Sequence, residues 1–265
     1  MSKHEYLMES GDEATRLENK TVEAQTVQHM ELVGLREGMT VLDAGAGTGA
    51  VARTMARLVG ATGSVVALDQ SEERLRHGRA LAKGIENLSF VQGDLKNVAL
   101  PSNQFDMVWS RFVFEYLKQP ELVLKQLGEL AKPNGRVVVG DLDGNGLFHF
   151  PISAQMSQQL EALQSVLEGV FDPLVGRKLY TLFRRSGFTD IRTHVLPYHV
   201  YAGEANREGL ENWEQKFATI RTVAMGAFPS ERAYDHFVQE FMGMLRDPDV
   251  FTYSILIIVE GTPPK

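Results

Sequence analysis

The stretch from Thr40 to Gly49 (T-V-L-D-A-G-A-G-T-G) constrains the fold more than any other part of the chain. Its apolar start predicts a short buried strand that ends at Asp43, and glycines follow at positions 45, 47 and 49. Helical spacing of apolar residues resumes directly afterwards. This order places bare backbone N–H groups at the positive end of a helix, where a ligand can approach the main chain. The glycine pattern alone is weak, because it also occurs in simple tight turns, so the rest of the chain decides its meaning.

Strand-like and helix-like segments alternate from residue 39 onward. The sequence predicts strands at 40–44, 64–69, 88–91, 105–109, 136–140, 191–200 and 251–259. Helices are predicted at about 48–59, from Ser71 to about Lys83, and at 178–186. Repeated strand–helix units indicate an α/β fold with a doubly wound, seven-stranded, mostly parallel sheet. Ligands bind such sheets at the carboxyl ends of the strands.

The regular alternation stops after Asp141. Gly144, Asn145 and Gly146 predict a flexible loop, followed by an amphipathic helix from about 152 to 170. Two more amphipathic helices are predicted within 203–247, and another precedes the sheet, starting at a capping box at Ser10. We interpret these helical segments as a cap over the carboxyl ends of the strands.

Composition excludes several classes of function. The net charge of −7, with no dense cluster of basic residues, argues against nucleic acid as a partner. The chain has no cysteine, which excludes disulfides, thiolate nucleophiles and cysteine-bound metals. The longest apolar run, 255–259, is too short to cross a bilayer, so we expect a soluble, cytoplasmic protein without a membrane span. Oligomerisation is possible but cannot be read from the sequence.

Polar side chains end four successive predicted strands: Asp43, Asp69, Asp94 and the pair Ser110-Arg111. Asp69, twenty residues after Gly49, is the expected position of a carboxylate that accepts hydrogen bonds from ribose hydroxyls. Asp94, with Leu95 beside it, is placed to contact an adenine ring. Residues 45–50 also fit a dinucleotide fingerprint, but Asp43 would repel a pyrophosphate and attract an ammonium or sulfonium group.

The runs V-L-D-A-G-A-G-T-G, V-V-A-L-D-Q-S, F-V-Q-G-D-L, F-D-M-V-W-S-R-F-V-F-E-Y-L and K-P-N-G-R-V-V-V resemble the successive motifs of class I S-adenosylmethionine-dependent methyltransferases. They are most similar in style to the small-molecule branch that includes the ubiquinone/menaquinone-type enzymes. The resemblance covers residues 38–141 well and does not cover 1–37 or 142–250. It implies S-adenosylmethionine as cofactor, bound by the following residues: Asp43, Gly45, Ala46, Gly47, Gly49, Asp69, Gln70, Asp94, Leu95, Ser110, Arg111 and, from the N-terminal helix, Arg16.

Methyl transfer from a sulfonium depends mainly on alignment and a dry pocket, and a base is needed only when the acceptor must lose a proton. Two residues are candidates for that base, His149 beyond the fifth predicted strand and Glu115, where relatives often carry histidine. Aromatic residues in the cap segments favour an apolar or aromatic small-molecule acceptor.

The expected organisation is an N-terminal helical cap segment (1–37) and a methyltransferase domain (38–265) with cap insertions at about 142–172 and 203–247. The alternatives are a nicotinamide-dependent oxidoreductase and a cofactor-binding protein without catalysis. The acceptor and the methylated atom are not indicated by the sequence.

Overall fold

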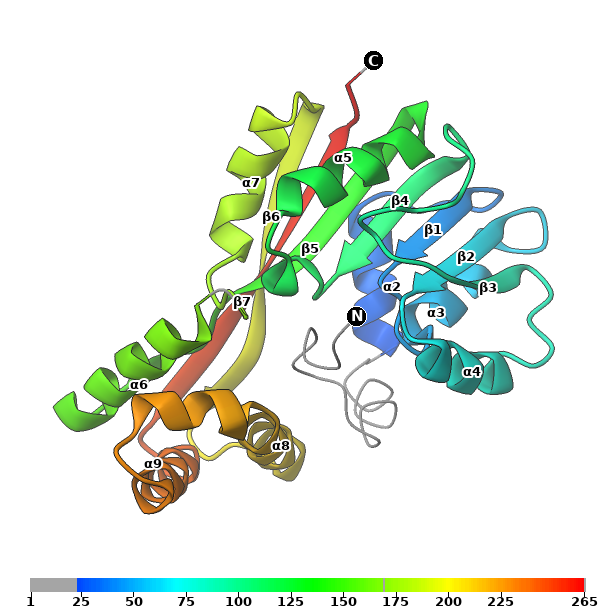
Figure 1. The fold of residues 1–265 in the computed structure, drawn as a ribbon. Helices are drawn as coiled ribbons and strands as arrows, with labels where there is room; N and C mark the ends of the chain where they lie inside the picture. Colours follow the sequence, from blue (N-terminus) through cyan, green and yellow to red (C-terminus); the bar gives the residue numbers. More distant parts are fainter. Residues whose placement is uncertain (1–22, 169, 265) are drawn as a thin grey trace.

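The computed structural model describes residues 23–168 and 170–264, which form a twisted sheet with helices on both faces and a helical group at one end (Figure 1). The seven strands lie in the order β3-β2-β1-β4-β5-β7-β6. Their bounds are β1 Thr40–Ala44, β2 Ser64–Asp69, β3 Leu88–Gln92, β4 Phe105–Arg111, β5 Ala131–Phe150, β6 Thr189–Ala202 and β7 Phe251–Thr262. The first five strands are parallel, whereas β7 runs antiparallel to both of its neighbours. The predicted mostly parallel seven-stranded sheet is confirmed.

Helices cover the two faces of the parallel part. One hydrophobic cluster joins the sheet to α2 (Glu23–Leu32) and α3 (Ala50–Val59), and α4 (Glu72–Leu81) lies next to them. A second cluster joins the other face to α5 (Pro120–Leu130) and α7 (Gly176–Arg185). Side chains alternate along each strand, so Val41 enters the first cluster and Leu42 the second. Both are fully buried, which stabilises the fold by about 1.5–3 kcal/mol for each side chain.

Local sequence signals set where the helices begin. Ser71 caps α4 by accepting a hydrogen bond from the Arg74 N–H, and Pro120 occupies the first turn of α5. Three helices outside the parallel sheet, α6 (Ala154–Leu167), α8 (Arg207–Ala224) and α9 (Glu231–Met244), begin with side-chain caps from Ser153, Asn206 and Ser230. A 3₁₀ turn, η2 (Met225–Ala227), follows α8.

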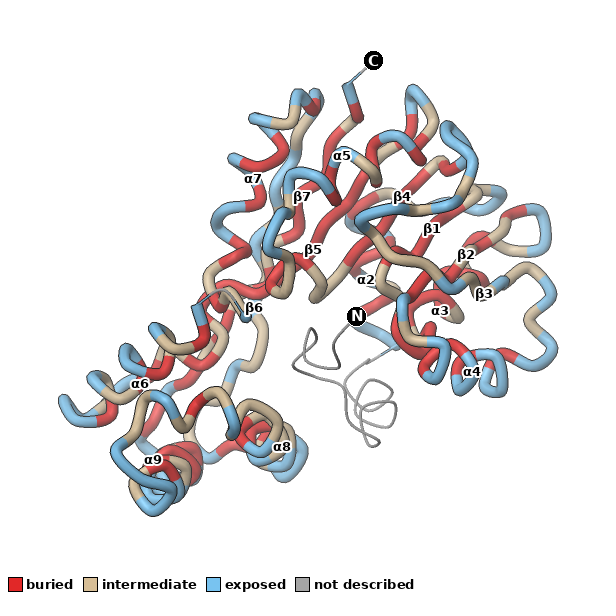
Figure 2. The backbone as a smooth tube through the Cα atoms, viewed as in Figure 1, coloured by how far each residue is buried: buried red, intermediate tan, exposed pale blue. Residues whose placement is uncertain are grey.

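These three helices pack together on the ends of the long antiparallel strands, beyond the carboxyl ends of the parallel strands (Figure 1). Figure 2 shows their buried sides facing one another. Their shared core, which we call the cap cluster, contains Leu163, Trp213, Phe217, Phe237 and Phe241. The helices predicted within 152–170 and 203–247 are therefore present, and they form a core separate from the two clusters on the sheet.

The flexible loop predicted at 144–146 was wrong. β5 does not end at residue 140 but continues to Phe150, paired with β7, and residues 144–147 form an irregularity between Asp143 and Phe148. Gly144 and Gly146 both have positive φ, a bulge geometry that resembles a loop in sequence. The strand predicted at 191–200 is present as β6, which contains Tyr198 and Tyr201. The predicted start of the N-terminal helix at Ser10 lies outside the described residues.

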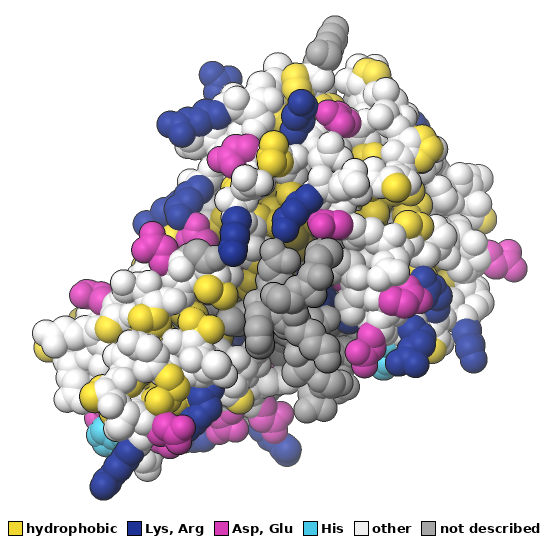
Figure 3. All heavy atoms as spheres, in the orientation of Figure 1, with side chains coloured by type: hydrophobic (Ala, Val, Ile, Leu, Met, Phe, Trp, Pro, Cys, Tyr) yellow, Lys and Arg dark blue, Asp and Glu magenta, His cyan; other side chains and the backbone are white. Residues whose placement is uncertain are grey.

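Lys and Arg side chains on the face drawn in Figure 3 are interspersed with Asp and Glu, and hydrophobic side chains gather around α6 and α9. Within the described ranges, no helix is both long and apolar enough to cross a membrane. The same residues contain no group of three or more histidine, aspartate or glutamate side chains arranged to hold a metal ion.

Candidate functional site

The glycine turn after β1 is tied to the neighbouring strand. The backbone N–H groups of Gly45 and Ala46 both donate to the Leu68 carbonyl oxygen, at 2.8 and 2.9 Å. Gly45 has a φ of +83°, and a Cβ there would lie 2.5 Å from Cγ2 of Val113. A side chain at this position would therefore push the turn away from the segment that follows β4.

A cavity of about 210 Å³ lies at this turn, at the carboxyl ends of the parallel strands. Nine of the predicted cofactor residues line it: Asp43, Gly45, Ala46, Gly47, Asp69, Gln70, Asp94, Leu95 and Arg111. The sequence analysis missed several other lining residues, among them Thr48, Arg74, Trp109 and Tyr116. We call this space the first cavity.

Side-chain alternation decides which strand-end residues reach the first cavity. Asp43 in β1 is the register partner of Trp109 in β4, and both belong to the sheet face that carries α2 and α3. Arg111, two residues after Trp109, shares that face. Ser110 therefore points to the opposite face, and it is fully buried and absent from the lining. The predicted pair Ser110-Arg111 is thus divided, with only the arginine at the cavity.

Asp43 is a strongly perturbed acid at the site. Burial raises its pKa to about 7, Arg111 opposes this and Asp69 reinforces it. Its Oδ2 atom is buried without a hydrogen-bond partner among the described residues. A buried carboxylate oxygen in this state favours a cationic ligand that can donate a hydrogen bond.

The pKa values of Arg111, beside Asp43, and of His29, which senses the charge of Arg111, are both lower than usual. Burial lowers the pKa of Arg111, while the neighbouring Tyr198 and Asp43 raise it. Burial, together with the positive charge of Arg111, lowers the pKa of His29 in α2 to about 4. His29 is therefore neutral at pH 7, and Arg111 supplies the positive charge beside Asp43.

Asp69, at the end of β2, and Asp94, after β3, accept hydrogen bonds from backbone N–H groups at the edge of the first cavity. Asp69 accepts from the N–H of Gly47 at 2.8 Å and from the N–H of Ser71 at 2.9 Å, and Arg74 lies 3.5 Å away. Asp94 accepts from the N–H of Lys96 at 2.9 Å. A carboxylate has about four acceptor positions, so these bonds allow Asp69 and Asp94 to accept from a ligand as well.

Gly49 and Arg16 are not brought to the cavity by the described structure. Gly49 begins α3 with a φ of +74°, and a Cβ there would lie 2.7 Å from the Phe90 ring. Its absent side chain therefore allows close packing against Phe90 rather than lining the cavity. Arg16 lies outside the described residues.

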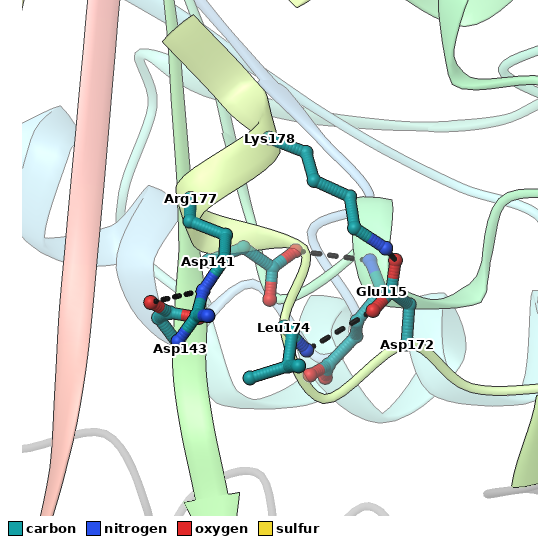
Figure 4. A network of polar contacts seen from close by, with 7 residues as sticks. All are labelled: Glu115, Asp141, Asp143, Asp172, Leu174, Arg177 and Lys178. Carbon is teal, nitrogen blue, oxygen red and sulfur yellow. Dashed lines mark hydrogen bonds and ion pairs between the residues drawn. The ribbon is translucent and has the colours of Figure 1, made fainter. Parts of the chain in front are cut away.

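Glu115 is held in place through its backbone. It lies in a 3₁₀ turn, η1 (Phe114–Tyr116), where its N–H donates to the buried Asp141 carboxylate at 3.1 Å and its carbonyl accepts from the N–H of Asp172 at 2.8 Å. Figure 4 shows the contact of Glu115 with Asp141 beside the Arg177–Asp143 and Lys178–Asp172 ion pairs. This network joins β5, η1 and the start of α7, and it fixes where the Glu115 side chain begins.

A second cavity, of about 90 Å³, lies between η1, the β5 irregularity and the cap cluster. Its lining is mostly apolar and includes Leu160, Leu163 and Phe217. Glu115 and Tyr116 line both cavities and so form the partition between them. The two spaces therefore meet at η1.

His149 does not line either cavity. Its ring is buried, with Nδ1 2.9 Å from the Thr252 hydroxyl and Nε2 3.1 Å from the Gly146 carbonyl. The ring also packs edge-on against Phe241, and burial lowers the pKa of His149. With both nitrogens engaged, His149 joins β5 to β7 and the cap cluster, and this geometry does not favour the predicted role as a base.

Comparison with known proteins gives the site a context. A family model described as "Methyltransferase domain" matches residues 35–187, more than half of the 265 residues. The ubiquinone/menaquinone biosynthesis C-methyltransferase of Pseudomonas entomophila is 34% identical over 151 residues, covering 56% of this chain and 55% of the relative. The chain thus spans about half the length of the curated relatives that it matches.

Solved structures share the fold at low identity. A SAM-dependent methyltransferase from Aquifex aeolicus has a TM-score of 0.55 at 23% identity, covering 71% of this chain and 92% of that protein. Phosphoethanolamine N-methyltransferase 2 of Haemonchus contortus, solved with S-adenosyl-L-methionine, has a TM-score of 0.57 at 18% identity, covering 91% of this chain and 53% of that protein. The second match covers 91% of the chain, whereas the family model ends at residue 187, before β6 and β7 begin.

Proposed function

Because this chain belongs to the methyltransferase-domain family, we propose that it transfers a methyl group from S-adenosylmethionine to a small-molecule acceptor. The observation that carries the proposal is the meeting of two cavities at Glu115 and Tyr116, one lined by the charged residues Asp43, Asp69, Asp94 and Arg111 and one mostly apolar. Family membership does not favour the nicotinamide-dependent alternative.

The first cavity fits S-adenosylmethionine on several independent features. The Oδ2 atom of Asp43, which has no hydrogen-bond partner among the described residues, suits the amino group of the methionine part. Gly45 has no side chain, so the turn can lie against Val113 and the methionine part can lie along the turn. Asp69 and Asp94 suit the ribose hydroxyls and the adenine amino group, with Gln70 and Leu95 beside the ring. Arg111 suits the carboxylate of the methionine part.

The second cavity suits the acceptor. Its lining of leucine and aromatic side chains supports an apolar or aromatic molecule. The cap cluster supplies apolar walls to this space, and η1 separates it from the first cavity. Tyr116 and Glu115, which line both cavities, would therefore lie next to both the methyl donor and the acceptor.

S-adenosylmethionine supplies an electrophilic methyl group on a positively charged sulfur. The chain contributes alignment, because the Asp141 and Asp172 contacts fix the backbone of Glu115 between the cavities. For an acceptor that must lose a proton, Glu115 is the ionisable side chain in position to take it. For an acceptor that is already nucleophilic, alignment and exclusion of water are sufficient.

The test is transfer of label from methyl-labelled S-adenosylmethionine into extract of the source organism, followed by identification of the labelled compound. We expect one labelled small molecule and tight binding of S-adenosylhomocysteine by calorimetry. Binding without any labelled product would favour the non-catalytic alternative, and binding of NADH instead would contradict the proposal. With the acceptor identified, Glu115→Gln distinguishes the two routes, since only proton removal requires the carboxylate.

A further inference from the structure

The second cavity contains one basic side chain among its described lining residues, Lys216 of α8. Its Nζ atom lies 4.1 Å from the centroid of the Trp213 ring and 3.1 Å from Oδ1 of Asn145. Trp213 and Asn145 line the same cavity. The ammonium is therefore held at the cavity wall by a ring below it and an amide beside it.

Asn145 reaches this position because of the irregularity in β5. The β5–β7 register shifts between Asp143 and Phe148, and the glycines on both sides of Asn145 have positive φ. A Cβ at Gly146 would lie 2.8 Å from the Trp213 ring, so the backbone presses closely on that ring. A regular strand would not bring Asn145 and Trp213 together around the Lys216 ammonium.

We propose that Lys216 selects acceptors that carry an anionic oxygen, a carboxylate or ionised hydroxyl, on an aromatic or apolar body. The inference rests on the proposed function and names the substrate class of the second cavity. An ammonium is a positively charged hydrogen-bond donor, and the amide of Asn145 keeps it at the wall of the cavity where a ligand oxygen would bind. In a mostly apolar cavity its attraction for an anion is stronger than in water. The apolar lining, including Leu163, Phe217 and Ile220, contacts the rest of the molecule.

The alternative is a purely packing role, in which the lysine stem and ammonium cover Trp213 and any ligand of the right size binds equally well. Probe ligands that differ only in charge distinguish anion recognition from packing. Benzoate and benzamide have nearly the same shape but differ in charge, and 2-naphthoate and 2-naphthamide form a larger matched pair. A recognition site for an anion prefers the acid in each pair, whereas a packing residue does not.

The experiment measures binding of these four probes to the full chain saturated with S-adenosylhomocysteine, by calorimetry. We expect each acid to bind at least about tenfold more tightly than its amide, a difference of roughly 1.4 kcal/mol. Lys216→Met should remove the preference without weakening amide binding, and Lys216→Arg should retain it. Lys125→Met, on the exposed side of α5, removes the same charge elsewhere and should change nothing.

Fluorescence gives the location of binding. The chain has two tryptophans, and Trp109→Phe leaves Trp213, beneath Lys216, as the reporter of acid binding. Equal affinity for acid and amide, no binding of the acids at millimolar concentration, or parallel loss of both probes in folded Lys216→Met would each overturn the proposal. Probe binding needs no methyl transfer, so its outcome is independent of whether labelled product forms.

Discussion

The two cavities share a wall at η1 but are built in different ways. The first is lined mainly by residues at the carboxyl ends of β1, β2, β3 and β4 and in the segments that follow them. The second is made of side chains from η1, the β5 irregularity, α6, α8 and α9, which lie as far as 126 residues apart between Glu115 and Phe241. The family model covers the first region and ends at residue 187, before α8 and α9 begin. The difference indicates that the proposed cofactor site depends mainly on local segments, whereas the proposed acceptor site depends on long-range packing.

The two regions also differ in polarity. Asp43, Asp69 and Arg111 place charges around the first cavity, while Trp213, Phe217 and Phe241 form the wall of the second. If the regions are independent, substitutions in one should leave the function of the other intact. The following predictions test that independence, starting with the largest expected effect.

Phe241→Ala should lower the free energy of unfolding by about 3–5 kcal/mol, because it empties the centre of the cap cluster. The Phe241 ring is fully buried and lies 4.9 Å from the ring of Phe217 and 5.1 Å from that of Trp213. Urea unfolding measures the loss, and calorimetry at a temperature where the variant is folded should give an unchanged affinity for S-adenosylhomocysteine. Phe251→Ala, at a half-exposed phenylalanine, should cost much less. A matching loss of cofactor affinity would mean that the two regions act as one unit.

Gly45→Ala should weaken S-adenosylhomocysteine binding roughly a hundredfold, because the turn must shift to relieve the 2.5 Å approach to Val113. Gly84→Ala is the matched control, since Gly84 has a φ of +86° but no atom within 4 Å of the place where a Cβ would lie. Gly84→Ala should lower the free energy of unfolding by about 1–2 kcal/mol, because of backbone strain alone, and leave the affinity for S-adenosylhomocysteine unchanged. Equal behaviour of the two variants would show that close approach at the turn is unimportant.

Cofactor affinity should rise with pH up to about 7 and then level off. Burial raises the pKa of Asp43 to about 7, and only the ionised form attracts the cofactor's amino group. The slope reaches at most about tenfold per pH unit, or 1.4 kcal/mol. Asp43→Asn should abolish this dependence and weaken binding at pH 8 by about 1.5–3 kcal/mol. Calorimetry from pH 5 to 8 tests both points, and pH-independent binding by the unsubstituted chain would contradict the assignment.

Asp43 and His29 change the free energy of unfolding with pH in opposite directions. Folded Asp43 holds its proton to higher pH than in the unfolded chain, so its contribution to stability falls between about pH 4 and 7. Folded His29, with a pKa of about 4, binds its proton less readily than in the unfolded chain, so its contribution rises between about pH 4 and 6.5. Because these trends oppose each other, ligand affinity reports on Asp43 more directly than stability does.

His149→Gln should have the smallest effect, a loss of about 1 kcal/mol of stability, because it disturbs the contacts with Thr252 and Gly146. Cofactor affinity and the rate of transfer to the identified acceptor should stay unchanged. Thermal unfolding and initial rates at saturating substrate measure the two effects separately. A large fall in rate without loss of stability would restore the predicted role of His149 as a base.

The sequence was sufficient where short-range geometry decides the outcome. Val41 and Leu42 predicted β1, the following glycines predicted the turn, and Ser71 predicted the start of α4. Nine predicted cofactor residues line one cavity because parallel strands end at a common edge. Trp109 could have been found in the same way, from its place on the same strand face as Asp43.

The sequence failed where distant segments decide the outcome. Gly144 and Gly146 read as a loop, but pairing with β7 makes them part of a strand irregularity. No local signal separates His149, which packs against Phe241 away from both cavities, from a loop histidine that faces a ligand.

By itself, the amino-acid sequence determined the parallel sheet, its glycine turn and the acids along its edge, because backbone conformation and residue periodicity depend on near neighbours. Only the tertiary structure decided that Ser110 turns away from the cavity, that Glu115 stands between two spaces and that Lys216 meets Asn145 over Trp213. These outcomes depend on strand register and helix packing between segments far apart in the chain, which local preferences do not specify.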